Sequence, residues 1–360
     1  MILQFGTSRF LQAHVDLFVS EALKPLPGEG PITVVQTTGN ADRARRLKAF
    51  DAGRFPVHIR GLMDAQTIDR VVEVTSVRRG LSAAADWREV SRLFVEQARA
   101  IVCNTGDRGY DLDPLDQPTD APPRSFPAKL LVLLKSRFSA GGAALDIYPC
   151  ELMPANGDAL QHVVLSLARA WSFESAFMDW IGECRFVNSL VDRIVSAPIE
   201  PVGAVAEPYA LWAIEDRPGL TPICRHPDIL LTDRLKEFEY RKLFILNLGH
   251  TALVEFWRDR SGFADLTVRE AIAGPDLRGR LESLYAEEVI PVFAALGQEA
   301  EARAYRARTM ERFANPFLDH RLADIAVNHD AKRGRRFGGL VHLADVYAPG
   351  LRLAWLRAHA

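Results

Sequence analysis

Three polar side chains interrupt a largely apolar segment in the second half of the sequence. Lys242, Asn247 and His250 lie within the run from Tyr240 to Thr251. Apolar surroundings disfavour a charged ammonium, so a lysine held there would have a lowered pKa and could accept a proton. An amide and an imidazole beside it could hold the oxygen that gives up this proton. The spacing therefore indicates general-base chemistry.

The same three residues fit one side of a helix. At about 100° per residue, His250 lies about 80° and Asn247 about 140° from Lys242. The alternative interpretation is structural: Lys242 extends its charge to solvent, and the other two are hydrogen-bonded core residues. Spacing alone favours that alternative, and the N-terminal part of the chain shifts the balance.

The N-terminal segment has the pattern of a strand, a tight turn and a helix. An apolar run meets Gly6, an amphipathic stretch continues to about Leu23, and a β-branched run follows at 32–36. This order is typical of the first unit of a dinucleotide-binding fold, in which the turn faces a pyrophosphate. Only the first glycine of Gly-x-Gly-x-x-Gly is present, with Ser8 at the second position. Arg9 could add charge toward the phosphates, although an ordinary strand–helix turn is the alternative.

The residues after the second strand leave the type of nicotinamide cofactor open. Gln36, Thr37 and Thr38 stand where an acidic residue would bind the ribose hydroxyls of NAD. The arginines that follow could hold the 2′-phosphate of NADP, or they form a solvated helix face. The pattern therefore predicts a nicotinamide cofactor without deciding between NAD and NADP.

The composition argues against several classes of protein. The 360 residues carry a net charge of −2, with 48% hydrophobic and 25% charged residues, so nothing points to nucleic acid or an anionic membrane as a partner. No apolar stretch approaches the roughly 20 residues of a membrane span. There is no recognisable secretory leader and no Cys-x-x-Cys pair, so we expect a cytoplasmic protein with reduced thiols. No His or Cys cluster has metal-ligand spacing, which favours metal-independent chemistry.

Hydrophobic periodicity predicts two domains. Strand and helix patterns alternate over residues 1–195, which indicates an α/β dinucleotide-binding domain. The proline-rich segment 198–227 has the pattern of an irregular connection. Residues 196–360 are predicted to form a mostly α-helical substrate-binding and catalytic domain, with Lys242 on its first long helix. A ligand between two such domains would lie in a cleft.

Six motifs, in one order along nearly the whole chain, resemble the long-chain polyol dehydrogenases, the mannitol dehydrogenase family. Each motif alone is weak, whereas six in order are specific. They are Leu3–Gly6 with Phe10-Leu11, Asn104–Tyr110, Pro149–Gly157, Phe186–Val195, Lys242 with Asn247 and His250, and Arg312–Pro316 with Lys332. The resemblance implies a Rossmann-like fold and an NAD-dependent dehydrogenase. Such an enzyme interconverts a secondary alcohol of a polyol or sugar acid and the corresponding ketose or keto acid.

The resemblance also implies roles for individual residues. Lys242 would be the general base, and Asn247 and His250 would bind the reacting oxygen. The implied substrate-binding residues are Asn188, Asp192, Arg193 and Lys332. The implied proton relay consists of Asp107 and Glu239. The implied cofactor-binding residues are Gly6, Thr7, Ser8, Arg9, Phe10, Asn104, Thr105 and Asp192.

One motif separates the branches of this family. The mannitol branch has Cys-Asp-Asn at Cys150, and its Asn is a second donor to the reacting oxygen, whereas Leu152 stands at that position here. Loss of such a donor can cost about 2.7–4 kcal/mol in the transition state. The sequence Cys-Glu-Leu resembles the altronate/tagaturonate branch. A hexuronate such as tagaturonate or altronate is therefore the expected substrate, with the mannitol/fructose type still open.

Two other functions are consistent with the sequence. Mannitol-1-phosphate 5-dehydrogenases have a similar Lys-Asn-His block, and the basic run 332–336 could bind their phosphate. A non-catalytic NAD-binding sensor on the same fold is the second alternative. In either case the expected partner is a small molecule, and many family members are monomers, so we expect a monomer or a small homo-oligomer.

Overall fold

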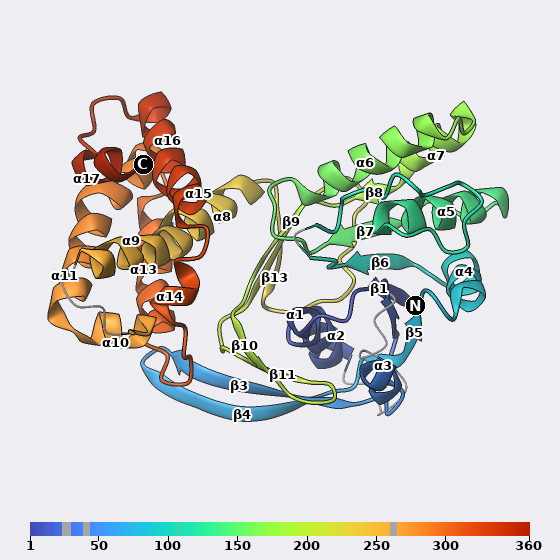
Figure 1. Cartoon of the computed structure of the whole chain (residues 1–360), viewed down its shortest axis with the longest axis horizontal. Helices are drawn as coiled ribbons and strands as arrows, with labels where there is room; N and C mark the ends of the chain where they lie inside the picture. The colour runs from blue at the N-terminus through green and yellow to red at the C-terminus, as the bar shows by residue number, and fades with distance from the viewer. Residues whose placement is uncertain (24–29, 39–43, 107, 260–264) are drawn as a thin grey trace. The chain divides into compact units, whose positions relative to one another are not determined.

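The computed structural model describes residues 1–23, 30–38, 44–106, 108–259 and 265–360 (Figure 1). It divides into two units that differ in architecture. Unit 1 consists of Met1–Ile59, Arg70–Ala206 and Ala210–Leu235. Unit 2 consists of Arg60–Asp69, Glu207–Tyr209 and Lys236–Ala360.

Unit 1 is built on a parallel sheet that has six strands among the described residues. These are β1 (Ile2–Phe5), β2 (Ile32–Gln36), β5 (Val77–Ser82), β6 (Ala100–Cys103), β7 (Asp146–Pro149) and β8 (Arg185–Phe186). Their order is β5-β2-β1-β6-β7-β8, and every neighbouring pair is parallel. This is the 3-2-1-4-5-6 order of a dinucleotide-binding fold. The predicted Rossmann-like class is thereby confirmed.

Helices cover both faces of this sheet (Figure 1). One face carries α4 (Trp87–Glu96), α5 (Phe126–Ser139), α6 (Asn156–Ala170) and α7 (Ser175–Glu183), whose apolar sides form a core with strand residues. Connections after β1 and β2 contain α1 (Arg9–Gln12), α2 (Val15–Leu23) and α3 (Ala44–Phe50). Strands buried on both faces explain the continuous apolar runs in the sequence.

Two smaller sheets follow from strands outside the main sheet. One has the order β10-β11-β3-β4, formed by β10 (Val195–Pro198), β11 (Ala204–Ala206), β3 (Phe55–Met63) and β4 (Gln66–Val74). The other has the order β13-β12-β9, formed by β13 (Ile229–Thr232), β12 (Leu211–Glu215) and β9 (Ser189–Asp192). The segment 198–227 is therefore not wholly irregular, because short strands alternate with its proline-containing connections.

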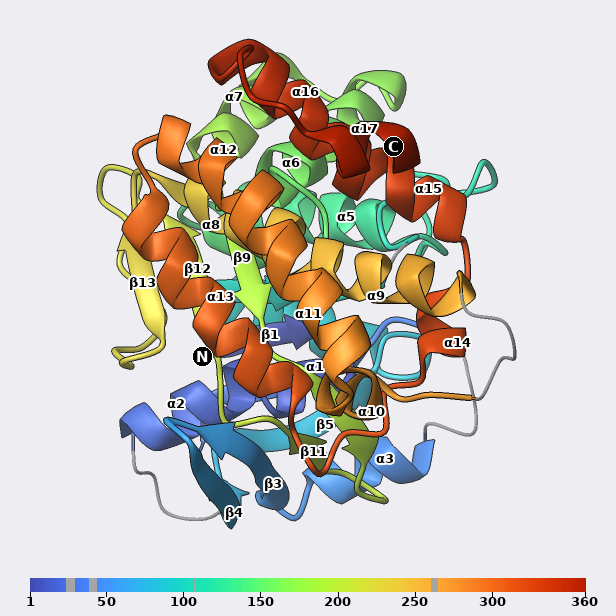
Figure 2. The same ribbon diagram turned by 90° about the vertical axis from the view of Figure 1, so that its left-hand side faces the viewer.

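Unit 2 is helical, as predicted for the second half of the chain. Its central rod is α8 (Leu235–Arg241), the π-helical turn η2 (Lys242–Asn247) and α9 (Leu248–Arg258). Around α9 pack α10 (Val268–Ala273), α11 (Pro275–Leu284), α14 (Leu322–Ile325) and α15 (His329–Arg333) (Figure 2). The remaining elements are η3 (Tyr285–Val289), α12 (Ile290–Ala295), α13 (Glu299–Phe313), η4 (Gly334–Gly338), α16 (Gly339–Tyr347) and α17 (Ala354–His359). Within the described segments, every helix is too short or too polar to span a lipid bilayer.

Unit 2 also contains two short pieces from the first two-thirds of the chain. The tip of the β3–β4 hairpin, Arg60–Asp69, is one of them, and Glu207–Tyr209 is the other. The carboxylate of Glu207 binds the guanidinium of Arg312 in a bidentate pair, at 2.9 and 2.8 Å. Their side chains are 2% and 1% exposed. Removing either partner would leave the other as a buried charge without a counter-ion, which strongly destabilises the fold.

Candidate active site

The helix that carries the predicted general base contains a π-helical turn. Residues Lys242–Asn247 form η2, between two α-helical stretches. Hydrogen bonds between residues five apart widen such a turn, so residues five apart stack on one face. We therefore expect Lys242 and Asn247 to lie nearer to one face than in an uninterrupted α-helix, which would separate them by about 140°. The long helix expected to carry Lys242 is therefore not a regular α-helix at this point.

Contacts from other helices of unit 2 hold this turn. The Tyr285 hydroxyl donates to the Ile245 carbonyl at 2.7 Å, and both groups are buried. Gly249 makes room for it, since a Cβ there would lie 2.0 Å from the Tyr285 oxygen. The Arg336 guanidinium donates to the Asn247 carbonyl at 3.0 Å. Carbonyl groups displaced from the α-helical pattern are thus satisfied from outside the helix, as buried backbone groups must be.

Lys242 and Asn247 are half-buried, and His250 is 7% exposed. The His250 ring contacts those of Phe313 and His320, with centroids 4.5 and 4.9 Å apart. Burial lowers the pKa of His250 well below its ordinary value, and neighbouring positive charges lower it further. The imidazole is therefore neutral at pH 7. Its Nε2 has no hydrogen-bond partner among the described residues, so it is available to an oxygen of a ligand.

The other predicted residues of the second half lie on neighbouring helices. Glu239 is half-buried on α8, one turn before Lys242. Lys332, near the end of α15, donates to the Ile325 carbonyl at 2.7 Å. Burial lowers the pKa of Lys332, and the charges of the nearby arginines contribute to the decrease. Asp107, the other predicted relay residue, lies outside the described residues.

In unit 1, the turn after β1 has the close approach that a dinucleotide-binding turn requires. Gly6 has a φ of +123°, and a Cβ there would lie 2.4 Å from the Asn104 carbonyl oxygen. Thr7 is buried, and the Ser8 hydroxyl accepts a hydrogen bond from the Leu11 N–H at 3.2 Å. Glycine is thus needed at the first position of the turn. This cradle fits a nicotinamide dinucleotide.

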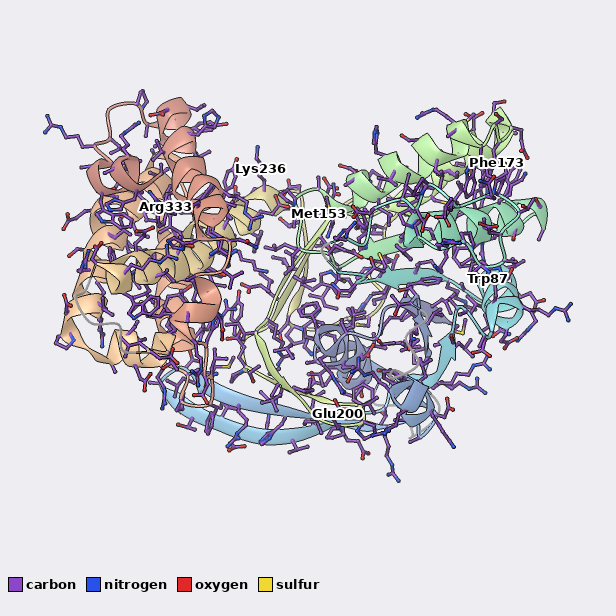
Figure 3. All side chains as sticks on the ribbon, viewed as in Figure 1. Trp87, Met153, Phe173, Glu200, Lys236 and Arg333 are labelled. Atoms are coloured by element: carbon purple, nitrogen blue, oxygen red, sulfur yellow. The ribbon has the colours of Figure 1, made fainter. Side chains whose placement is uncertain are left out.

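Arg9 is engaged differently from the phosphate contact suggested by its position. Its guanidinium donates to two carbonyls of the β10–β11 connection at 2.9 and 3.0 Å. It also pairs at 2.6 Å with Glu200, which is labelled in Figure 3. The Phe10 ring stacks on His14, with centroids 4.7 Å apart. These contacts give both residues a role in fixing the turn.

A buried carboxyl group that the sequence reasoning missed joins the ends of β6 and β7. Glu151 is 5% exposed and accepts hydrogen bonds from the Thr105 N–H and hydroxyl, both at 3.0 Å, and from the Tyr110 hydroxyl at 3.2 Å. Burial raises the pKa of Glu151. The Asn104 amide donates to the Cys150 carbonyl at 2.7 Å. The available signal was topological, because the ends of adjacent parallel strands meet at one edge of the sheet.

The motif around β9 is held within unit 1. The Asn188 side-chain oxygen accepts two backbone N–H groups at the start of α6, at 2.9 and 3.0 Å. Its nitrogen donates to the carboxylates of Asp158 and Glu215, at 2.8 and 3.1 Å. Asp192 is 2% exposed at the end of β9, and Arg193 donates to a carbonyl between α1 and α2 at 2.7 Å. Asn188 therefore positions α6, since both polar atoms of its amide are engaged.

Leu152, the branch-specific position, is 70% exposed after β7, beside the Met153 labelled in Figure 3. Across the parts of the chain that the structure describes, no group of three or more His, Cys, Asp or Glu residues is arranged to hold a metal ion. The polar groups assembled around η2 are thus an amine, an amide and an imidazole. These are groups that exchange a proton with an oxygen and hold that oxygen in place.

A dinucleotide-binding sheet joined to a helical unit with this set of groups is the arrangement of a dehydrogenase. The chain belongs to the mannitol dehydrogenase family: residues 1–222 match the mannitol dehydrogenase Rossmann domain, and residues 234–350 match the mannitol dehydrogenase C-terminal domain. The family resemblance predicted from the six motifs is thereby confirmed.

Curated relatives are similar along most of the chain. The altronate oxidoreductase of Bacillus subtilis (strain 168) is 30% identical over 357 residues, which cover 92% of this chain and 72% of the relative. That of Halalkalibacterium halodurans is 31% identical over 350 residues, 91% of this chain and 67% of the relative. That of Escherichia coli O1:K1 / APEC is 32% identical over 352 residues, which cover 91% of this chain and 71% of the relative. The protein is therefore an oxidoreductase that acts on CH–OH groups, as predicted.

Solved structures share the fold. The structure of D-sorbitol dehydrogenase in substrate-free form has a TM-score of 0.78 at 23% identity, over 95% of this chain and 75% of that one. The ternary complex of Pseudomonas fluorescens mannitol 2-dehydrogenase with NAD and D-mannitol has a TM-score of 0.74 at 18% identity, over 96% and 78%. Both matches extend through the sheet and the helical region, in agreement with the fold class predicted above.

Proposed function

We propose that this protein is an NAD-dependent, metal-independent oxidoreductase that interconverts a secondary alcohol of a sugar acid and the corresponding keto acid. The substrate class is a hexuronate, of the tagaturonate/altronate type. The names of the curated relatives support that class, and the complex of mannitol 2-dehydrogenase with NAD supports the cofactor. The observation that supports the chemistry is η2, the π-helical turn that begins at Lys242 and ends at Asn247, followed three residues later by His250, whose Nε2 has no partner among the described residues.

In the proposed mechanism, Lys242 is the general base. Its neutral amine takes the proton of the substrate hydroxyl, while the Asn247 amide and the His250 imidazole hold the oxygen as negative charge develops. In the opposite direction, the Lys242 ammonium returns the proton to the carbonyl oxygen. Bound NAD supplies the hydride acceptor. Glu239, one turn before Lys242 on α8, is assigned to carry the proton between Lys242 and solvent.

The neutral state of His250 matters for this assignment. A charged imidazolium beside Lys242 would favour the neutral lysine. It would also add a positive charge to a region that already contains Lys332 and Arg336. Burial keeps the ring neutral, so the Nε2 hydrogen bond orients the oxygen without introducing a charge of its own. With Leu152 at the position of the second amide donor, Asn247 and His250 are the two groups assigned to the oxygen.

The turn after β1 is assigned to the cofactor. Gly6, Thr7 and Ser8 supply its backbone, and Asn104 and Thr105 lie at the end of the neighbouring strand. Arg9 and Phe10 hold the shape of the turn through the contacts described above. In unit 1, Asp192 and Arg193 at the end of β9 are also assigned to ligand binding, and in unit 2 Lys332 is assigned to it.

The assignment is tested by following nicotinamide absorbance with purified protein. NADH and then NADPH are offered with tagaturonate, fructuronate, fructose and fructose-6-phosphate. We expect oxidation of NADH with a hexuronate. Turnover confined to fructose-6-phosphate would replace the hexuronate with a sugar phosphate. NADH binding without turnover of any of the four compounds would contradict the proposed activity and favour a non-catalytic sensor.

A further inference from the structure

The basic run 332–336 contains cations in different environments. Arg333, labelled in Figure 3, lies 3.3 Å from the carboxylate of Glu255. Arg335 is exposed to solvent. In contrast, Lys332 is half-buried and Arg336 is 9% exposed. Arg333 is half-buried as well, so what distinguishes Lys332 from Arg333 is the absence of a neighbouring carboxylate among the described residues.

Lys332 and Arg336 form no ion pair with any carboxylate of the described residues. Lys332 donates to one backbone carbonyl at 2.7 Å, and Arg336 donates to the Asn247 carbonyl at 3.0 Å and the Thr251 hydroxyl at 2.7 Å. The Arg336 Nε has no partner among those residues. Burial lowers the pKa of Arg336 to about 10, with a further contribution from Arg335. A buried guanidinium beside a half-buried ammonium is costly without a counter-ion, and a bound anion would reduce that cost.

This uncompensated charge lies beside the proposed reacting groups. Arg336 holds the backbone of Asn247, and the charges of both cations contribute to the lowered pKa of His250. His320 contacts the His250 ring, and its Nδ1 is a second buried nitrogen without a partner in the described part of the chain. Asp324 is the acidic residue whose charge acts on His320, but it pairs with neither cation.

We propose that Lys332 and Arg336 bind the carboxylate of the sugar-acid substrate and thereby select an acid over a neutral polyol of the same length. This rests on the proposed function, because it assigns substrate recognition to the same group of residues. A guanidinium and an ammonium together offer the charged donors that a carboxylate accepts. A phosphate group presents similar chemistry, and the experiment separates the two. A hydrogen bond to a charged group corresponds to about 10- to 100-fold in affinity.

The test measures binding without turnover. Altronate and altritol differ only in the carboxylate, and neither can react in the presence of saturating NADH because both are already reduced. Calorimetric titration gives their dissociation constants for the wild type and for Lys332→Met, Arg336→Met and Arg335→Met. The last variant removes the same charge from the same segment at an exposed position. Inorganic phosphate and fructose-6-phosphate are titrated in parallel.

We expect the wild type and Arg335→Met to bind altronate about 10- to 100-fold more tightly than altritol. Lys332→Met and Arg336→Met should lose this preference through weaker altronate binding. Arg336 also supports η2, so Arg336→Met could weaken the binding of both ligands by disturbing that turn. In that case the result for Lys332→Met decides, because this change removes no contact to η2. Equal wild-type affinities for the two ligands, an equal loss of both in Lys332→Met, or tighter binding of the phosphates than of altronate would overturn the proposal.

These outcomes are separate from those of the turnover assay. Hexuronate turnover together with equal affinity for altronate and altritol would overturn the carboxylate assignment alone. A retained preference for altronate without turnover of any hexuronate would overturn the proposed function, while supporting acid recognition by Lys332 and Arg336.

Discussion

Replacement of Gly249 by alanine examines how the π-helical turn is held. The added Cβ would lie 2.0 Å from the Tyr285 hydroxyl and 3.1 Å from a ring carbon of Phe313. Tyr285 is fully buried, so its ring has no free space into which to move. The hydroxyl must nevertheless withdraw, and its 2.7 Å hydrogen bond to the Ile245 carbonyl would break. The change is therefore expected to disturb the turn that carries Lys242.

The magnitude follows from three contributions. Overpacking in a dense core costs about 1–3 kcal/mol. The lost hydrogen bond adds about 0.5–1.5 kcal/mol. Alanine has the better helix propensity, which returns about 1 kcal/mol. Gly249→Ala should therefore lower the free energy of unfolding by about 0.5–3.5 kcal/mol, measured by calorimetry or denaturant titration, and should also reduce turnover.

Tyr285→Phe is the matched partner in a double-mutant cycle. In the wild-type background it removes the hydrogen bond to Ile245 and should cost about 1 kcal/mol. In the Gly249→Ala background it removes the atom that clashes with the new methyl group, so it should increase stability. The sign of the effect is thus expected to reverse between backgrounds. An effect of the same sign and size in both would refute this account of the turn.

Three further changes test other parts of the site. Lys242→Ala should lower kcat by roughly 10²–10⁴-fold, with NADH affinity preserved in a fluorescence titration, and near-normal turnover would contradict its assignment as base. Because the pKa of His250 in the folded protein is below its ordinary value of 6.5, the unfolded chain takes up this proton first as the pH falls. Stability should then decrease below about pH 6.5, by at most about 1.4 kcal/mol per pH unit from this residue. His250→Gln should flatten that slope in unfolding titrations, and an unchanged slope would argue against a buried neutral ring. Glu151→Ala should cost about 1–3 kcal/mol and weaken NADH binding, since the N–H and hydroxyl of Thr105 lose their acceptor. Glu151→Gln keeps an acceptor and should remain close to the wild type, so identical behaviour of the two variants would count against this role.

Elements with a strong local pattern were predictable from the sequence. The apolar run Ala100–Cys103 is β6, and the stretch with helical periodicity at Glu299–Phe313 is α13. Continuous apolar runs and sustained helical periodicity carry this information locally. The sheet β13-β12-β9 was not predicted, because each strand has only four or five residues. Its strands are stabilised by pairing with partners that lie elsewhere along the chain.

The residue types around η2 were predictable, whereas their geometry was not. The turn depends on the Tyr285 hydroxyl, which comes from 40 residues further along the chain than its acceptor. Burial of Arg336 is likewise a tertiary effect, since the run 332–336 has the composition of a solvated segment. Nothing local distinguishes it from the exposed Arg335. The carboxyl group of Glu151 finds Thr105 only because β6 and β7 are neighbours in the sheet.

Unit 2 is assembled from separate parts of the chain, and this limits where the chain can be divided. A fragment that starts at Lys236 would keep Arg312 but would lose Glu207, the carboxylate that neutralises it. Breaking a buried pair costs about 3–5 kcal/mol, which is a large part of the stability of a typical domain. We therefore do not expect the helical half to fold stably when it is expressed without the two short pieces that precede it in the chain. Recombination or excision that separates it from Arg60–Asp69 and Glu207–Tyr209 should yield a chain that is readily degraded by proteases.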